Sequence, residues 1–259
     1  MTIKRLLVAN RAEIARRVFR TAREMGIFTV AVYSEGDSEA PFVGDADLAV
    51  ALNGTTAADS YLNAEKILSA AKSVGADAIH PGYGFLSENA DFAKAVSDAG
   101  IIWVGPPPSA IAAMGDKLAA KRTMVDAAVP TLPSVEVTDA TDLSAVSKDI
   151  GFPLLVKASA GGGGKGMRVV DAENELEDAI AGAKREALGA FGDDTVFLER
   201  YLSTPRHVEI QVLGDRYGKV IHCFEHECSI QRRHQKVIEE APSPVLSQIL
   251  RNQMGEAAV

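Results

Sequence analysis

The segment from Cys228 to Pro242 combines residue types that bind anions. It holds three basic side chains, those of Arg232, Arg233 and Lys236, beside one histidine and two glutamines. Cations this close together repel one another unless an anion lies among them. The segment therefore predicts an anion-binding site, and the simpler alternative is a solvated charged face.

A glycine-rich run, residues 161–166, is the second candidate. Five of its six residues are glycine, and backbone amides without side chains can approach phosphate oxygens closely. Lys157, Lys165 and Arg168 supply positive charge around it. The run does not fit a Walker A loop, because Met167 and Arg168 stand where that motif needs Lys and Ser or Thr. Strands are expected on both sides, which favours a hairpin lid over phosphates against an ordinary surface loop.

The composition limits the class of partner. The chain has 259 residues, 27 basic and 35 acidic, with a net charge of -8, which argues against a nucleic-acid partner. The first apolar run is too short for a signal peptide, and no run has membrane-spanning length. Two cysteines, Cys223 and Cys228, suit a reducing compartment. We expect a soluble cytoplasmic protein without a membrane or nucleic-acid partner.

Short apolar segments alternate with amphipathic ones in the first part of the chain. Asn10 stands where a helix N-cap belongs, with Glu13 as its partner in a capping box. The pattern predicts strands at 6–9, 29–33, 77–80 and 101–104, and helices after Asn10 and at 62–74 and 89–99. This alternation predicts a Rossmann-like α/β domain with a parallel sheet covered on both faces. Its first turn lacks G-x-G-x-x-G, so no dinucleotide site is expected there.

The pattern changes after Pro108. We expect a helix at 109–128, a connection over 130–142, strands at 154–158, 167–171 and 195–199, a helix at 173–188, and a hairpin from 207–213 and 219–224. Mixed helices and hairpins predict an α+β unit after the first domain.

Three runs together resemble biotin carboxylase, an ATP-grasp enzyme. They are residues 80–89 (HPGYGFLSEN), the glycine run, and residues 229–236 (SIQRRHQK), and the resemblance extends from about Lys4 to the C-terminus. It implies a biotin carboxylase N-terminal (pre-ATP-grasp) domain over 1–110. An ATP-grasp domain follows over 111–259, incomplete at its C-terminus, with a glycine-rich lid over about 131–203.

The resemblance also implies which residues bind the nucleotide phosphates. Lys117 and Lys157 match the two lysines that clamp them, and Gly163 and Gly164 match the phosphate-contacting glycines. On its own, Lys117 would be an exposed helix lysine. The preceding Met-Gly-Asp supports the match.

Other positions follow from the same resemblance. The segment in which the backbone contacts adenine is Glu199, Arg200, Tyr201 and Leu202. His207, Gln231 and His234 match positions around the ribose and phosphates, although His207 alone would be an ordinary half-buried histidine. Lys236 matches the residue that helps to hold bicarbonate, and it is the one catalytic residue predicted in the chain.

The implied reaction is the first half-reaction of a biotin-dependent acyl-CoA or pyruvate carboxylase. Bicarbonate attacks the γ-phosphate of Mg-ATP, and the resulting carboxyphosphate carboxylates biotin on a carrier domain. The implied partners are the biotinyl carrier domain and a carboxyltransferase, with a homodimer in the full-length enzyme. The alternatives are a non-catalytic nucleotide-binding or assembly module, and another ATP-grasp ligase such as carbamoyl-phosphate synthetase.

The sequence departs from the family in two ways. Ala12 and Ala160 stand where the family usually has glycine. The family's magnesium-binding glutamates, its catalytic Arg and Glu, and its biotin-side Arg would lie beyond Val259. No strand with an acidic pair is expected after Lys236, so no metal ligand is assigned. We therefore expect a fragment of a longer enzyme that is catalytically impaired by itself.

A zinc cluster is the remaining possibility. His222, His226 and Cys228 would share one face of a strand by alternation, with Cys223 next to them. Their spacing follows no usual zinc pattern, in which cysteines pair two to four residues apart. The prediction is that these are strand residues.

Overall fold

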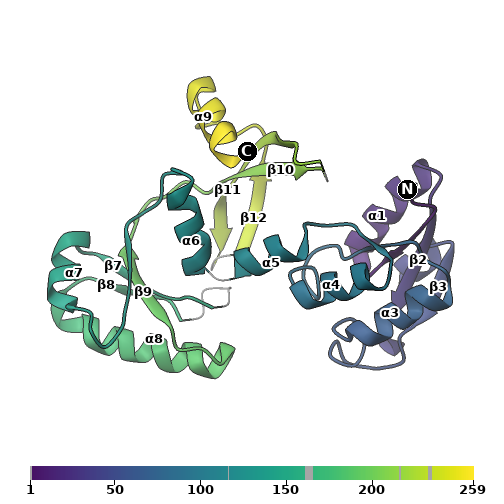
Figure 1. Ribbon diagram of the computed structural model, residues 1–259, viewed down its shortest axis with the longest axis horizontal. Helices are drawn as coiled ribbons and strands as arrows, with labels where there is room; N and C mark the ends of the chain where they lie inside the picture. The colour runs from purple at the N-terminus through teal and green to yellow at the C-terminus, as the bar shows by residue number, and fades with distance from the viewer. Residues whose placement is uncertain (1, 116, 161–165, 216, 233–234) are drawn as a thin grey trace. The chain divides into compact units, whose positions relative to one another are not determined.

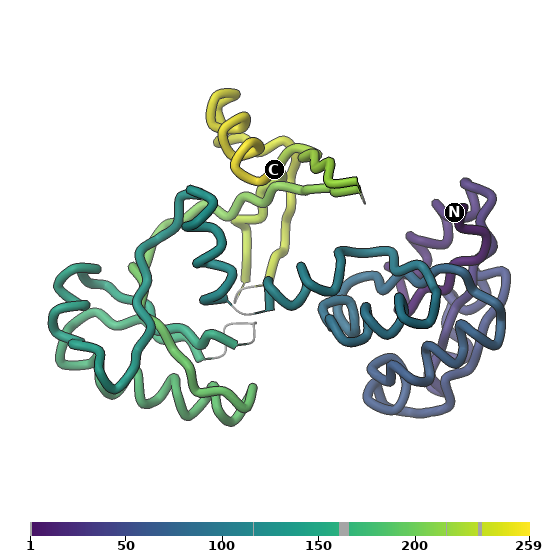
Figure 2. Tube along the Cα trace, viewed as in Figure 1, coloured from purple at the N-terminus to yellow at the C-terminus, as the bar shows by residue number. Residues whose placement is uncertain are grey.

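The computed structural model describes residues 2–115, 117–160, 166–215, 217–232 and 235–259. The chain divides into two compact units, Met1–Gly115 and Asp116–Val259. Figure 1 labels most of their helices and strands, and Figure 2 follows the chain through the same elements. None of the helices in the described ranges has both the length and the apolar character that crossing a membrane requires.

The first unit is built on a parallel sheet of order β3-β2-β1-β4-β5. Its strands are β1 (Arg5–Val8), β2 (Phe28–Tyr33), β3 (Leu48–Ala51), β4 (Ala78–His80) and β5 (Ile102–Trp103). Its helices are α1 (Ala12–Glu24), η1 (Glu35–Asp37), α2 (Pro41–Asp45), α3 (Ala64–Ser73), α4 (Ala90–Asp98) and α5 (Pro108–Gly115). This order has the strand reversal typical of Rossmann-like folds.

Side chains on the strands alternate between two clusters, one on each face of the sheet. One cluster joins Leu7 to Ile67 of α3 and Phe92 of α4, and the other joins Leu6 to Phe19 of α1. All five side chains are buried. The predicted parallel sheet with helices on both faces is therefore confirmed.

The predicted capping box at Asn10 is wrong. Helix α1 begins at Ala12, and its N-cap is Arg11, whose side chain makes no capping hydrogen bond. The Asn10 amide instead donates to the carbonyls of Pro81 at 2.8 Å and Tyr83 at 2.7 Å. Asn10 thus ties the first turn to the 80–89 loop, a long-range role that local spacing could not reveal.

The substitution Ala12→Gly is expected to stabilise the first unit by about 0.5–1 kcal/mol. Ala12 has a φ of 54°, where a Cβ costs about 1–2 kcal/mol. The greater freedom of glycine in the unfolded chain offsets part of this gain. Thermal unfolding would measure it, with Ala15→Gly in the buried interior of α1 as the destabilising control. Equal effects of the two substitutions would contradict the prediction.

The second unit contains two antiparallel sheets. One has the order β6-β9-β7-β8, and the other has the order β10-β11-β12. The strands are β6 (Ser134–Glu136), β7 (Leu154–Ala158), β8 (Arg168–Val170), β9 (Val196–Arg200), β10 (Val208–Gly214), β11 (Val220–Arg232) and β12 (Gln235–Glu240). The helices are α6 (Lys117–Asp126), α7 (Leu143–Ile150), η2 (Glu173–Glu175), α8 (Leu176–Phe191) and α9 (Gln248–Ala258).

The helix expected over 109–128 is present as α5 and α6, with residue 116 between them outside the described ranges. Two predictions for this region need correction. The expected connection over 130–142 contains β6, which extends the sheet by pairing with β9. An acidic pair embedded in a strand does follow Lys236, because β12 contains Lys236 and continues through Glu239 and Glu240, both exposed.

The glycine run connects two neighbouring antiparallel strands, β7 and β8. The Ala158 N–H, at the end of β7, donates to the Gly166 carbonyl at 3.1 Å, which continues this pairing past the start of β8 at Arg168. The flanking strands thus pair as predicted for a hairpin. Residues 161–165, including Gly163 and Gly164, lie outside the described ranges.

Strand β11 contains a bulge near Phe224, which has a φ of 64°. A two-residue step along β10 is matched there by a three-residue step along β11. The bulge reverses the alternation, so His222 packs against Gly255 of α9, whereas His226 and Cys228 lie on the opposite face near β10. The prediction that these three residues share one face is wrong for this reason.

Candidate functional site

Two lysines share one carboxylate on the sheet of β6, β9, β7 and β8. Lys157 of β7 donates to Oε1 of Glu199 at 2.8 Å, and Lys121 of α6 donates to Oε2 at 3.0 Å. The Phe197 ring lies under both ammonium groups, 5.5 Å from Lys157 and 5.8 Å from Lys121. Only 11% of the Glu199 side chain is exposed, so solvent screens this network weakly.

Lys117 adds a third ammonium group to this network. Its Nζ donates to the carbonyl of Ala158 at 3.4 Å, and burial together with the charge of Lys157 lowers its pKa. Burial alone would raise the pKa of Glu199, but the hydrogen bonds and charges of Lys157 and Lys121 hold it below 4.5. Lys121 and Lys157 therefore share one carboxylate, Lys117 lies within electrostatic range of Lys157, and this local positive charge favours an anionic ligand.

The segment from Glu199 to Leu202 leaves the end of β9. Within it, the Tyr201 N–H donates to the carbonyl of Pro153 at 3.0 Å, and Arg200 donates to that of Ile150 at 3.4 Å. The Tyr201 amide thus continues the sheet, and Leu202 follows as an exposed residue.

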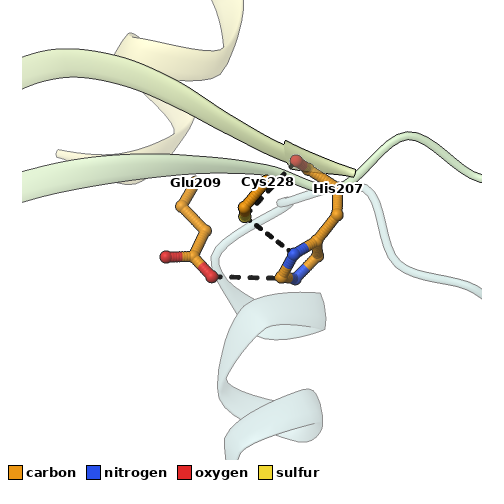
Figure 3. Close-up of side chains that lie close together, drawn as sticks. All are labelled: His207, Glu209 and Cys228. Atoms are coloured by element: carbon orange, nitrogen blue, oxygen red, sulfur yellow. Dashed lines mark hydrogen bonds and ion pairs between the residues drawn. The ribbon is translucent and has the colours of Figure 1, made fainter. Parts of the chain in front are cut away.

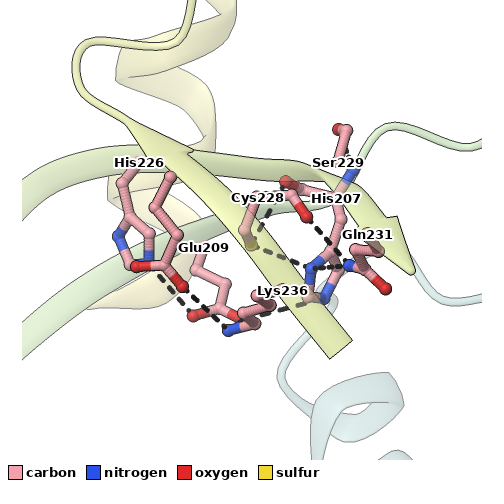
Figure 4. Close-up of polar contacts among 8 residues, drawn as sticks. His207, Glu209, His226, Cys228, Ser229, Gln231 and Lys236 are labelled. Atoms are coloured by element: carbon pink, nitrogen blue, oxygen red, sulfur yellow. Dashed lines mark hydrogen bonds and ion pairs between the residues drawn. The ribbon is translucent and has the colours of Figure 1, made fainter. Parts of the chain in front are cut away.

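A second polar cluster lies on β10, β11 and β12. The Sγ of Cys228 lies 2.9 Å from Nδ1 of His207 (Figure 3). The Gln231 side-chain amide lies 3.1 Å from the same Nδ1 and donates to the Cys228 carbonyl at 2.9 Å (Figure 4). Because an amide nitrogen only donates, Nδ1 of His207 is the acceptor in its contact with Gln231.

Glu209 is the centre of this cluster. One of its oxygens lies 3.1 Å from Nε2 of His226, and the other accepts a hydrogen bond from Lys236 and lies 3.7 Å from Nε2 of His207 (Figure 4). Glu239 of β12 lies 3.9 Å from the Lys236 ammonium. Lys236, the predicted bicarbonate residue, is therefore held between two carboxylates.

The charges of this cluster reinforce one another. The hydrogen bond to Glu209 raises the pKa of Lys236, and the same bond lowers the pKa of Glu209. Burial, and then the negative charge of Glu209, raise the pKa of the Cys228 thiol. Near neutrality the cluster thus holds an ammonium, a carboxylate and a protonated thiol.

The structure brings the predicted residues together in two groups. Lys117, Lys157 and Glu199 form the first, and His207, Gln231 and Lys236 form the second. His234 lies outside the described ranges, as do the two predicted glycines. Two members, Lys121 and Glu209, were missed by the sequence analysis, and Cys228 was considered there only for a zinc cluster with His222 and His226. Helical spacing from Lys117 and strand alternation from His207 could have indicated the first two.

Comparisons with known proteins agree with this architecture. Residues 2–111 match the family model "Biotin carboxylase, N-terminal domain", and residues 116–259 match "Carbamoyl-phosphate synthase L chain, ATP binding domain". The biotin carboxylase match in the first unit disfavours the carbamoyl-phosphate synthetase alternative.

Two curated relatives and one solved structure illustrate the similarity. The mitochondrial methylcrotonoyl-CoA carboxylase subunit alpha of Dictyostelium discoideum is 54% identical over 99% of this chain and 37% of its own length. Biotin carboxylase 1 of Bacillus subtilis is 51% identical over 99% of this chain and 58% of its own length. The biotin carboxylase domain dimer of Hydrogenobacter thermophilus 2-oxoglutarate carboxylase, in complex with MgADP, ADP and bicarbonate, is 47% identical. The structural match covers 100% of this chain and 57% of the Hydrogenobacter chain, with a TM-score of 0.91.

The chain thus spans between about a third and three fifths of the length of these proteins. The predicted fold class, a Rossmann-like domain followed by an ATP-grasp domain, is confirmed. The chain belongs to the biotin carboxylase family, and its two units carry that family's N-terminal and ATP-binding domains.

Proposed function

We propose that the chain binds ATP through Lys117 and Lys157 and bicarbonate beside Lys236. In the whole enzyme this would serve the carboxylation of biotin on a carrier domain. The observation that carries the proposal is the pair of cations, Lys121 and Lys157, that share the single carboxylate of Glu199, with Lys117 close enough to Lys157 for that charge to lower its pKa. A triphosphate at the start of the glycine run would supply the missing negative charge.

The proposed chemistry depends on position and charge. A bicarbonate oxygen attacks the γ-phosphorus, ADP leaves, and carboxyphosphate forms. Ammonium groups offset the charge that develops on the transferring phosphoryl group. For Lys236 to hold bicarbonate, its ammonium must exchange Glu209 for the bound anion, which is feasible because 35% of its side chain is exposed.

The proposal extends to magnesium, which would supply further charge neutralisation at the phosphates. Glu199 does not fit as its ligand, because both of its oxygens already accept from lysines. The roles proposed for the residues of this chain therefore include no magnesium ligand. The glycines, His234 and the adenine segment 199–202 keep their predicted nucleotide-binding roles as part of this proposal.

Partners and location also belong to the proposal. Relatives named methylcrotonoyl-CoA carboxylase and 2-oxoglutarate carboxylase indicate a carrier domain and a carboxyltransferase as partners. The dimer of the 2-oxoglutarate carboxylase domain supports a homodimer here. We place the protein in the cytoplasm, although the Dictyostelium relative is mitochondrial.

Lys157→Ala is expected to weaken ATP binding by about 10- to 100-fold. A hydrogen bond to a charged group contributes about 1.5–3 kcal/mol, which corresponds to this change in affinity. Isothermal titration calorimetry of the 259-residue chain would measure it. The same substitution should weaken the binding of AMP, which lacks the outer phosphates, much less than the binding of ATP.

The matched control is Lys148→Ala, an exposed lysine in the last turn of α7. It should bind ATP like the wild type. Equal ATP affinity of the Lys157→Ala and Lys148→Ala variants would refute the role of Lys157 in nucleotide binding.

A further inference from the structure

Four side chains form a two-by-two array on one face of the β10–β11 ladder. Glu209 pairs directly with His226, and two residues further along each strand the Cys228 N–H donates to the carbonyl of His207 at 2.9 Å. Cβ atoms of directly opposite residues lie about 4.5–5.5 Å apart. The ladder thus gathers two imidazoles, a carboxylate and a thiol around a single small volume.

These groups are close enough to bind one ion. Ligand atoms of His207, Glu209 and Cys228 all lie within 4.8 Å of one another. Tetrahedral zinc, with bonds of about 2.0–2.3 Å, needs ligand atoms about 3.3–3.8 Å apart, so side-chain movements of about 1 Å would close the site. His226 lies 3.1 Å from the second oxygen of Glu209, which is the outer support that ligating carboxylates usually have.

We propose that this array binds Zn²⁺ through Sγ of Cys228, an imidazole nitrogen of His207 and the carboxylate of Glu209. The fourth position would be open to water. The thiol gives its proton to solvent as the Zn–S bond forms. The thiolate and the carboxylate then balance the two positive charges of the ion.

The donor set distinguishes this ion from magnesium. Thiolate and imidazole favour zinc, whereas magnesium prefers an all-oxygen octahedral site. A second group, formed by His226, Cys228 and Glu239, shares the same thiol. The His207 group is favoured because His207 and Cys228 already touch, whereas half of the Glu239 side chain is exposed and faces Lys236.

Zinc binding would alter the proposed bicarbonate and nucleotide group, formed by His207, Gln231 and Lys236. It removes Glu209 from Lys236 and takes His207 away from its contact with Gln231. Zinc would therefore oppose nucleotide and bicarbonate binding, a consequence that rests on the proposed function. Metal binding itself does not rest on it.

The test is a titration of the 259-residue chain with Co²⁺ without nucleotide, followed by displacement with Zn²⁺. Thiolate ligation gives a near-ultraviolet charge-transfer band, which we expect to saturate at a single equivalent. Cys228→Ser should abolish the band. Cys223→Ser, at the exposed cysteine of the same strand, is the matched control and should retain it. Excess Mg²⁺ should not displace the cobalt.

Further variants distinguish the ligand sets. His207→Ala and Glu209→Gln should each weaken Co²⁺ binding by about 10- to 100-fold or more. A loss of that size is already typical when a residue that only supports a metal ligand is changed. Circular dichroism would confirm that each variant is folded. A band that survives Cys228→Ser, or that disappears in Glu239→Gln but not in His207→Ala, would overturn the proposal. ATP titration is a separate measurement, so a chain that binds cobalt but not ATP would contradict only the proposed function.

Discussion

Glu199→Gln is expected to destabilise the second unit by about 3 kcal/mol. Removing one partner of a buried ion pair costs about 3–5 kcal/mol, because the remaining charge lacks compensation. The lower end applies here, since 18% of the Lys121 side chain and 25% of the Lys157 side chain are exposed. Calorimetric unfolding would measure the loss, and hydrogen exchange would locate it in β7, β9 and α6.

The loss should depend on pH in a defined direction. The pKa of Glu199 in the folded chain is held below its usual 4.5, so its stabilising effect is present above about pH 4.5 and disappears as the pH falls through the folded value. The difference in the free energy of unfolding between the wild type and Glu199→Gln should therefore be large near neutrality and decrease as the pH becomes acidic. Glu177→Gln, at an exposed position on α8, is the matched control and should show neither effect. A difference that stays constant down to acid pH would contradict the assignment.

Much of the first unit could be predicted because its signals are local. Buried strands such as β1 are short apolar runs, and the amphipathic pattern of α4 follows a true N-cap, Asn89, which accepts from the Phe92 N–H. The positions of Lys117 and Lys157 came from the family resemblance. Their shared carboxylate network needed the structure, because Glu199 meets Lys157 only through the pairing of β7 with β9.

The errors arose where distant contacts override local patterns. Asn10 has the residue type of an N-cap, but its amide is used by the carbonyls of Pro81 and Tyr83. Alternation placed His222 with Cys228, and a bulge at Phe224 separates them. An inserted bulge residue leaves no periodic signal in the sequence, so the register that brings Cys228 to His207 could not be derived from spacing.

Arg251→Met is expected to destabilise the second unit by about 3–5 kcal/mol. The Glu225 side chain is fully buried, with 0% exposed, and its Oε1 accepts from Arg251 Nε at 2.7 Å and from the Ser243 N–H at 3.1 Å. Its Oε2 has no hydrogen-bond partner among the described residues. The negative charge of Glu225 therefore depends on Arg251, and methionine would leave it uncompensated. Thermal unfolding would measure the loss of stability.

The effect should be concentrated where α9 meets β11. Glu225 and Glu227 lie on the α9 face of β11, and His226 and Cys228 lie on the opposite face of the same strand. Loss of the Arg251 bond should therefore increase hydrogen exchange in β11 and loosen the cluster around Glu209. Arg185→Met, at an exposed arginine of α8, makes the same chemical change and should alter stability by less than about 0.5 kcal/mol. If both variants unfolded at the same temperature, Arg251 would not be the residue that stabilises the buried carboxylate.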